Sequence, residues 1–581
     1  MLIFRVLSIL SLFLLNGCAD VPEKSGSAEK SASPVKTVEK REKKPVKAYK
    51  NNIDPDVLYM LLTAELAGQR EQYGIALEGY MEAAKRAKDP KYAERAARIA
   101  MYMKDGTKTD EAVALWLGQD PNNPTAIKIA ILSAIRNGDK KAITAHLHDL
   151  LKVDPTGFEN SVLELTSVFQ QEGKAASFYE ALDDVALKNP DKAVIYFVQS
   201  LLSVQMKKND LAETKIQQAL KLQPDWDKAL IFQAQIAVFS GDLEKAKTLL
   251  KNDAARLPNN SKIKKMLAQV LIKTASYEEA VGVYQDIIKA EPADVESQFA
   301  LALVYMQLEQ VGKAEDIFKK LTEQAQWQSQ ASFYLGKIEE KRDNLKKALT
   351  WFDKVKDGAF MFDASMSSIS LLAKDKQFDE ANARISLLPA QFPKQKLRIV
   401  LIQVEVLNLQ KQYEKAYQLL SDELAKEPEQ KELLYTRALM AERIDKLDIV
   451  EADLKKILAK YPDDAEALNA LGYTLLDRTN RYSEAEKYLL KALQLQPDEA
   501  VIMDSYGWLQ FKLGNKLQAL EYLQKAYAKQ PESEIAGHLA EVLWVLDRKE
   551  EAKKIFDKAI KDAPEDEYLL DFQQRILDGA K

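Results

Sequence analysis

The stretch AVIMDSYGWLQFKLGNKLQALEYLQKAYAKQP, from Ala500 to Pro531, decides the fold. It contains two runs rich in helix-forming residues, and the turn residue Gly514 separates them. Proline cannot continue a helix, so Pro531 ends the second run. Two helices pack closely only where the crossing residues are small, and Gly507 and Ala519 meet that need. The stretch therefore predicts a pair of closely packed helices.

The same pattern recurs along the chain with an average period of 34 residues. A small residue marks each unit, and a large apolar residue follows four positions later on the same helical face. Proline stands twelve positions after the small residue in nine of the eleven units, where it separates one unit from the next. The eleven marker residues are Ala212, Ala246, Ala280, Ala314, Ala348, Ala381, Ala416, Val450, Ala485, Ala519 and Ala552. Because each unit exposes an apolar face, the units must stack, and we expect an all-α superhelical solenoid.

Composition agrees with a helical chain. The 581 residues include 20 Gly and 19 Pro, whereas average usage would give roughly 70 in all. We expect regular repeats over residues 206–564, about four irregular ones over 51–205, and a capping helix over 565–581. The markers expected in the irregular part are Ala76, Ala112, Ala142 and Ala175.

The first residues, MLIFRVLSILSLFLLNGCAD, have the layout of a secretory signal. One positive charge at Arg5 precedes an apolar run that is too short to span a bilayer. Leu15-Asn16-Gly17 then precedes Cys18, which is the one cysteine of the chain. These residues resemble the bacterial lipobox, which implies removal of residues 1–17 and lipidation of Cys18. The other interpretation is an ordinary signal peptide with a chance cysteine.

The segment 18–50 is expected to be a disordered tether, since it contains almost no large apolar side chains. Residues 19–50 carry nine Lys or Arg and five Asp or Glu, a net charge of +4. Such a basic tether could contact anionic lipid or cell-wall polymer, but a solvated linker is the simpler interpretation. The resemblance to the lipobox, with Ala19 rather than Asp after the cysteine, implies anchoring in the outer membrane.

Chemistry-bearing motifs are scarce. His146 and His148 are two residues apart on a helix and cannot face one metal ion, and His538 is interpreted as a packing residue. No phosphate-binding, dinucleotide-binding or zinc-protease motif occurs, so we expect no enzyme, no metal and no cofactor. Residues 51–581 hold 73 Lys or Arg and 83 Asp or Glu, a net charge of −10, which disfavours nucleic acid as a partner.

The repeat pattern resembles the tetratricopeptide-repeat family, in which the first helix of each repeat lines a groove. The resemblance implies a peptide-binding groove, and its candidate residues in the best-matched repeats are Asn469, Tyr473, Asp504, Trp508, Phe511 and Lys512. Aromatic rings and hydrogen-bonding groups together suit an extended peptide. The alternative is that Trp508 and Phe511 pack between repeats. If the groove interpretation holds, Trp508→Ala weakens partner binding and hardly changes thermal unfolding.

The stretches ALGYTLLDRTNRYSEAEKYLLKALQLQPDEA, MDSYGWLQFKLG and HLAEVLWVLDRKEEA resemble a family of large outer-membrane tetratricopeptide-repeat lipoproteins of Gram-negative bacteria. Members act as adaptors for a periplasmic carboxyl-terminal processing protease. The resemblance implies a non-catalytic, membrane-anchored scaffold that binds this protease and its peptidoglycan-hydrolase substrates, with the solenoid in the periplasm. Two other functions stay open: an assembly factor for outer-membrane proteins or exopolysaccharide secretion, and a cell-wall hydrolase.

Overall fold

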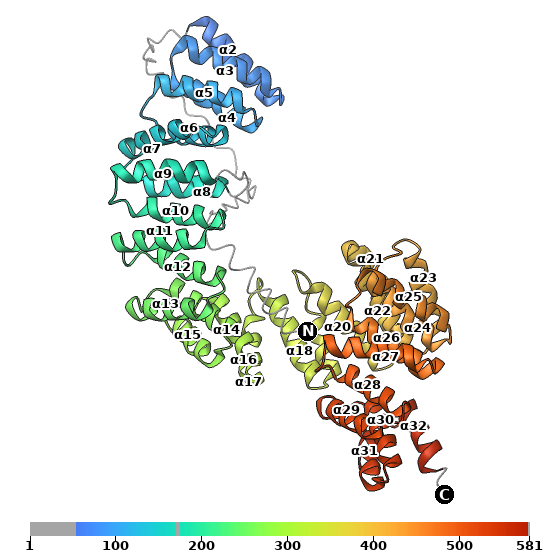
Figure 1. The fold of residues 1–581 in the computed structure, drawn as a ribbon. Helices are drawn as coiled ribbons and strands as arrows, with labels where there is room; N and C mark the ends of the chain where they lie inside the picture. The colour runs from blue at the N-terminus through green and yellow to red at the C-terminus, as the bar shows by residue number, and fades with distance from the viewer. Residues whose placement is uncertain (1–53, 170–174, 579–581) are drawn as a thin grey trace, which may run out of the picture. The chain divides into compact units, whose positions relative to one another are not determined.

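The computed structural model describes residues 54–169 and 175–578, and within them the chain forms helices and no strands (Figure 1). Helices α2 to α31 form fifteen successive pairs, and the short helix α32 follows them. The all-α solenoid expected from the repeats is thus confirmed. The predicted signal segment 1–17 and tether 18–50 lie outside the described residues.

The chain divides into two compact units, the first ending at Ile317 and the second beginning at Phe318. The first unit contains α2 (Pro55–Gln69), α3 (Tyr73–Ala87), α4 (Pro90–Tyr102), α5 (Gly106–Gln119), α6 (Pro124–Asn137), α7 (Lys140–Val153), α8 (Phe158–Phe169), α9 (Ala175–Lys188), α10 (Ala193–Gln205), α11 (Asn209–Leu222), α12 (Asp227–Phe239), α13 (Leu243–Arg256), α14 (Ser261–Lys273), α15 (Tyr277–Ala290) and α16 (Val295–Gln307). Helix α17 (Val311–Leu321) contains the boundary.

The second unit continues the series of helix pairs. It contains α18 (Gln328–Lys341), α19 (Leu345–Phe352), α20 (Met361–Lys374), α21 (Phe378–Gln391), the 3₁₀ turn η1 (Pro393–Gln395), α22 (Lys396–Leu409), α23 (Tyr413–Leu424), α24 (Lys431–Arg443), α25 (Leu447–Lys460), α26 (Ala465–Thr479), α27 (Tyr482–Leu495), α28 (Ala500–Lys512), α29 (Lys516–Lys529), α30 (Ser533–Val545), α31 (Lys549–Asp562), α32 (Glu567–Phe572) and the π-helical η2 (Gln573–Leu577). Among the described residues, none of the helices is long and apolar enough to cross a bilayer.

The eleven marker residues all lie on the second helix of a pair, and each is at most 2% exposed. The large apolar residues four positions later are buried as well, from Ile216 to Phe556. These two positions are one helical turn apart, so they point to the same side. They form the inner layer against which the first helices pack.

A residue with left-handed backbone angles stands five positions before every marker. It forms the tight turn between the two helices of a pair, where a positive φ reverses the chain. These residues are Lys207, Gly241, Ala275, Glu309, Asp343, Lys376, Lys411, Asp445, Asn480, Gly514 and Asp547. Nine of the eleven carry a side chain, although glycine adopts this conformation with the least strain.

The left-handed turns also set the repeat register in the irregular part. They occur at Glu71, Lys104 and Gly138, which places the marker positions at Ala76, Thr109 and Ile143. All three markers are buried. The sequence-based choice of Ala112 was therefore three residues late and that of Ala142 one residue early. Alanine identity was misleading there, because threonine and isoleucine occupy the equivalent sites.

The missing prolines have a structural counterpart. The two units without a proline, marked by Ala314 and Ala348, have second helices of 11 and 8 residues, α17 and α19. Most other second helices have 14 residues. In these two units the helix stops early and a longer non-helical connection replaces the proline.

Glycine permits close approach at the helix crossings. A Cβ atom on Gly507 would lie 2.9 Å from Cγ of Leu523, and one on Gly472 would lie 2.6 Å from Cγ of Leu489. The glycine of the first helix therefore faces the large apolar residue of the second helix. The expected pairing of Gly507 with Ala519 stays a prediction. At the equivalent crossing, the backbone oxygen of the marker Ala485 lies 3.2 Å from the Cβ position at Gly472.

Hydrogen bonds fasten the turns between repeats to the helix pair that follows. Lys456 and Lys491 donate hydrogen bonds to the carbonyl oxygens of Pro428 and Pro462 at 2.7 and 2.6 Å. The basic side chain comes from the second helix and the carbonyl from the turn that precedes the first helix of the same pair. The prolines that separate repeats thus also supply acceptors that hold each turn to the following hairpin.

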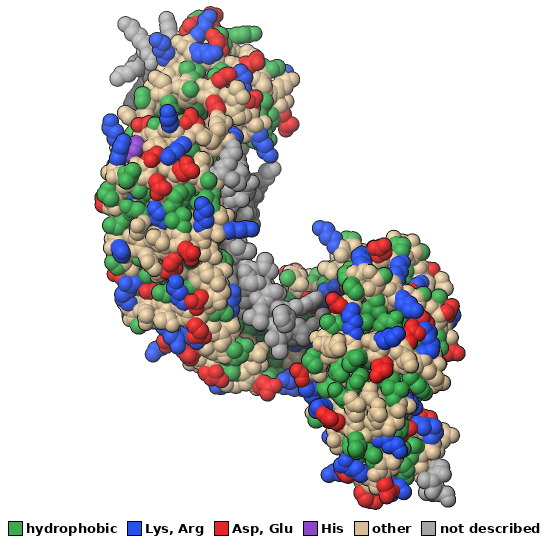
Figure 2. Space-filling view, viewed as in Figure 1, with side chains coloured by type: hydrophobic (Ala, Val, Ile, Leu, Met, Phe, Trp, Pro, Cys, Tyr) green, Lys and Arg blue, Asp and Glu red, His purple; other side chains and the backbone are tan. Residues whose placement is uncertain are grey.

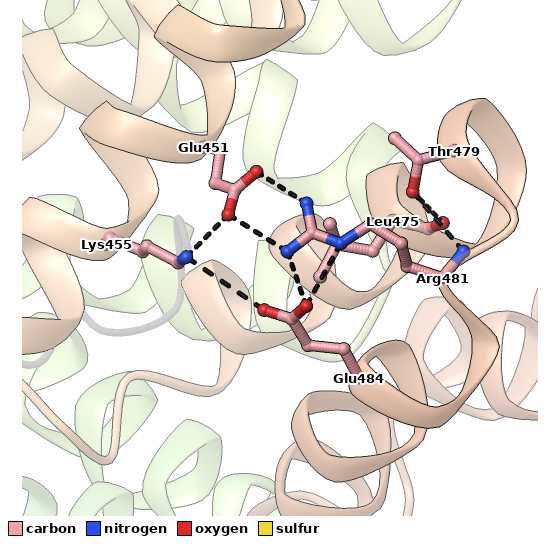
Figure 3. Close-up of polar contacts among 6 residues, drawn as sticks. All are labelled: Glu451, Lys455, Leu475, Thr479, Arg481 and Glu484. Atoms are coloured by element: carbon pink, nitrogen blue, oxygen red, sulfur yellow. Dashed lines mark hydrogen bonds and ion pairs between the residues drawn. The ribbon is translucent and has the colours of Figure 1, made fainter.

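An ion-pair network links α25 to α27 (Figure 3). The Arg481 guanidinium donates to Glu451 at 2.8 Å and to Glu484 at 3.0 Å, and the Lys455 ammonium also donates to Glu451. Hydrogen bonds from Arg481 and Lys455 lower the pKa of Glu451 to about 2. The carboxylate therefore stays ionised in the folded chain and ties two repeats together.

Candidate functional site

The six candidate groove residues lie on α26 and α28, the first helices of consecutive repeats. Asp504 and Trp508 are buried, with 4% exposure each. Asn469, Tyr473 and Phe511 are partly buried, and Lys512 is exposed. The six are therefore close together in the fold but differ in how much of each side chain a partner could contact.

Trp508 is held inside a stack of side chains. Its ring lies 4.1 Å from that of His538, at an interplanar angle of 17°, and 5.1 Å from that of Phe511. The Lys512 ammonium lies 4.3 Å from the centre of the indole. His538 belongs to the next repeat, so Trp508 packs between repeats. Its burial favours the packing interpretation for this residue.

Asp504 and His538 form a buried ion pair. Nδ1 of His538 lies 3.0 Å from Oδ2 and 3.1 Å from Oδ1 of Asp504. Burial by itself would lower the pKa of His538, but the carboxylates of Asp504 and Glu534 outweigh it and raise this pKa above the ordinary value. The imidazole is therefore more easily protonated here than in water. Both ring nitrogens of the protonated form are hydrogen-bond donors.

Tyr473, on α26, reaches α30, the first helix two repeats further along, to which His538 also belongs. Its hydroxyl donates to Glu534 at 2.7 Å and lies 3.5 Å from Nε2 of His538. Burial raises the pKa of Glu534 and that of Tyr473. Helices α26, α28 and α30 thus share one polar cluster, composed of Tyr473, Asp504, Glu534 and His538.

A pocket of about 250 Å³ opens beside this cluster. The first helices α24, α26, α28 and α30 form most of its wall, with contributions from α25 and from Tyr568 of α32. Three tyrosines line it: Tyr435, Tyr473 and Tyr568. Its charged lining residues are Glu442, Asp504, Glu532, Glu534 and Arg443. Four carboxylates and one guanidinium make the lining acidic.

One acceptor in this pocket has no partner in the fold. Oδ1 of Asn469 is buried and makes no hydrogen bond. An unpaired buried acceptor costs about 1–3 kcal/mol. Asn469, Tyr473 and Asp504 are the predicted residues that line the pocket, whereas Trp508, Phe511 and Lys512 do not.

Sequence reasoning missed His538, Glu534 and Glu442 as members of this site. A signal was available for His538, since it follows Asp504 by 34 residues, one repeat period. Equivalent positions on neighbouring first helices lie side by side in a solenoid. Two complementary titratable groups at that spacing therefore indicate a contact.

Metal binding has no candidate site in the part of the chain that the structure describes. No group of three or more His, Cys, Asp or Glu residues there could hold a metal ion. Figure 2 shows Lys and Arg interspersed with Asp and Glu over the visible face, without a continuous basic stripe. Cys18, the predicted lipid anchor, lies outside the described residues. The pocket and its polar cluster are thus the best candidate for a binding site.

Comparisons with known proteins agree with the repeat architecture. Tetratricopeptide-repeat family models match residues 511–576, 265–329 and 451–500. The TPR repeat-containing protein PA4667 of Pseudomonas aeruginosa is 30% identical over 531 residues, which cover 91% of this chain and 88% of that protein.

Solved structures with related helices show lower similarity. Naa15/Naa10 bound to HypK-THB has a TM-score of 0.32 and 12% identity, covering 86% of this chain and 99% of that one. TTC0263, a thermophilic TPR protein of Thermus thermophilus, has a TM-score of 0.28 and 25% identity, covering 31% of this chain and 95% of that one.

Proposed function

Because this chain belongs to the tetratricopeptide-repeat proteins, we propose that it is a non-catalytic scaffold that brings a periplasmic carboxyl-terminal processing protease together with peptidoglycan-hydrolase substrates. The observation that carries the proposal is the pocketed face made by α24, α26, α28 and α30. Extended surfaces on first helices are how such solenoids bind polypeptides. The specific partners come from the resemblance of residues 460–560 to adaptor lipoproteins.

The mechanism is local concentration. A scaffold that holds protease and substrate at once converts their encounter into an intramolecular event, and this raises the effective concentration to the millimolar range. Lipidation of Cys18 would place both proteins at the outer membrane, near the cell wall. No catalytic residue in the scaffold is required.

The proposal is tested with purified proteins. The full chain in detergent is mixed with the processing protease and one peptidoglycan hydrolase, and the loss of hydrolase is followed on gels. We expect degradation to accelerate at least about tenfold when the chain is present, as multivalency allows. The chain without protease should leave both the hydrolase and purified peptidoglycan intact.

Two results would contradict this function. Equal degradation with and without the chain would remove the adaptor role. Solubilisation of peptidoglycan by the chain alone would show an enzyme. As a further control, the protease with a catalytic-residue substitution should bind the chain and degrade nothing.

A further inference from the structure

We propose that the pocket between α24, α26, α28 and α30 binds the cationic side chain of a lysine or arginine in an extended segment of a partner protein. This inference rests on the proposed function, because it states which feature of a bound polypeptide the scaffold recognises. Neither the family nor the relatives' names assign a ligand to this pocket.

The charges of the lining favour a cationic ligand. Glu442, Glu532 and Glu534 line the pocket in addition to Asp504, which is paired with His538. Arg443 is the one cationic residue of the lining. An incoming carboxylate would meet like charges, whereas an ammonium or guanidinium would meet opposite ones. The balance therefore selects a cation.

Two carboxyl groups of the pocket are desolvated. Burial raises the pKa of Glu442, and the same holds for Glu534. Arg478 and Arg443 act on Glu442 and His538 acts on Glu534 in the opposite direction, but burial outweighs these cations at both carboxyl groups. A partly buried carboxylate gains more from a nearby cation than an exposed one does. Both carboxylates are thus prepared for a cationic ligand.

Aromatic rings form part of the pocket wall. Tyr435, Tyr473 and Tyr568 line the same pocket from three different helices. A cation next to a tyrosine face is attracted by the negative face of the ring, and more strongly when it is desolvated. Rings and carboxylates together match a lysine or arginine head group.

Size narrows the ligand further. A volume of about 250 Å³ is below the 300–1,000 Å³ usual for sites that enclose a small molecule. It suits one long side chain whose main chain runs along the helices outside. Exposed Val501 and Leu439 at the pocket edge offer apolar contact to the methylene groups of such a side chain.

The test uses the full chain and four small probes. Nα-acetyl-arginine amide and Nα-acetyl-lysine amide are compared with Nα-acetyl-citrulline amide and Nα-acetyl-glutamate amide by saturation-transfer NMR, which detects weak binding to a large protein. Citrulline has the shape of arginine without its charge. We expect the two cationic probes to bind at least about tenfold more tightly than the other two, a difference of about 1.4 kcal/mol.

Matched variants locate the binding. Glu442→Gln and Glu534→Gln, on α24 and α30, should each weaken arginine-amide binding about three- to tenfold. Glu550→Gln makes the same charge change on an exposed site of α31 and should leave binding unchanged. Circular dichroism of each variant shows whether a loss of binding reflects misfolding. The two pocket variants lie on different helices, so they test the pocket independently. Equal binding of citrulline and arginine amides, or full binding by both folded pocket variants, would overturn the inference.

The outcome also separates this inference from the proposed function. Accelerated degradation of the hydrolase without cation binding would refute the pocket specificity and leave the scaffold role standing. Cation binding without accelerated degradation would support the pocket and refute the protease-adaptor role.

Discussion

Asp504 and His538 occupy equivalent positions on consecutive first helices, and their side chains meet at 3.0 Å in the interior of the second unit. The pair is isolated from solvent, with the carboxyl and imidazole side chains 5% and 6% exposed. A buried ion pair is costly to break, because the remaining partner keeps its charge without compensation. The contact between these two repeats therefore depends on the charge of one histidine.

Replacing Asp504 by Asn should destabilise α28 and α30 in a pH-dependent way. The pKa of His538 is raised in the folded chain, so its stabilising contribution is complete below about pH 6.5 and is lost as pH rises through the folded-state pKa. We expect a loss of about 3–5 kcal/mol at about pH 6 and a smaller one at about pH 9. Hydrogen exchange of α28 and α30 measures it. A loss that is equal at both pH values would contradict this account.

Trp508→Ala should be mainly a stability variant. Because the indole is buried against His538 and Phe511, removing it should cost about 3–5 kcal/mol in local stability. This is the result that the packing alternative predicts, whereas under the groove interpretation unfolding would hardly change. Hydrogen exchange across α28–α30 is the measurement, and the control is Leu517→Ala, which removes an exposed side chain of α29. Unchanged exchange in the Trp508 variant would show that the stack contributes nothing.

Gly472→Ala should overpack the crossing of α26 and α27. The new Cβ would meet Leu489 at 2.6 Å, and overpacking a core costs about 1–3 kcal/mol. Gly282→Ala provides the matched control, because a Cβ at that helical site meets nothing within 4 Å. That change should stabilise α15 by about 0.5–1 kcal/mol. Chemical denaturation measures the free energy of unfolding of both variants. A change of the same sign in both would be inconsistent with the crossing geometry.

Arg481→Ala should weaken the link between α25 and α27 modestly. The network in Figure 3 is partly exposed, so each pair contributes about 0.2–1 kcal/mol. The depressed pKa of Glu451 makes this contribution complete above its unfolded value of 4.5 and lost as pH falls toward about 2. Denaturation at about pH 7 and about pH 3 should show a smaller difference between wild type and variant at the lower pH. Lys525→Ala, which removes an ion pair within one helix, is the control.

Cys18→Ser tests the proposed membrane anchor. If the cysteine carries the lipid, the variant should appear as soluble protein or as uncleaved precursor, because two acyl chains are needed for stable anchoring. Fractionation of cell envelopes and the mass of the mature chain give the answer. Normal processing with unchanged membrane association would contradict lipidation at this residue.

The helix pairs were predictable because they follow from spacing alone. Ala246 and Leu250 lie one turn apart on α13, and the same pair of positions recurs in every repeat, so burial could be deduced from periodicity. The repeat register in the first unit was harder to predict, because Thr109 and Ile143 occupy positions where other repeats have alanine. There the backbone turn, rather than residue identity, marks the repeat.

The candidate site was only partly predictable. Three of the predicted groove residues, Asn469, Tyr473 and Asp504, line the pocket, whereas Trp508 is stacked on His538 and is not part of the lining. A family pattern gives the helix face and not the depth of each side chain. Glu442 and Glu534 were not predicted as site residues because acidic residues on helices are common. Only the fold shows which of them become desolvated.

The left-handed turns carry a consequence for the evolution of this chain. A residue with a side chain in that conformation stores about 1–2 kcal/mol of strain, less for Asn or Asp, and nine such residues recur from Lys207 to Asp547. Turns of consecutive repeats are neighbours, as the 2.8 Å contact between Asp445 and Arg478 shows, so glycine replacements should be additive only between repeats that are not adjacent. None of these nine residues lines the pocket. Thermal tolerance can therefore be adjusted one repeat at a time without altering the ligand-facing surface.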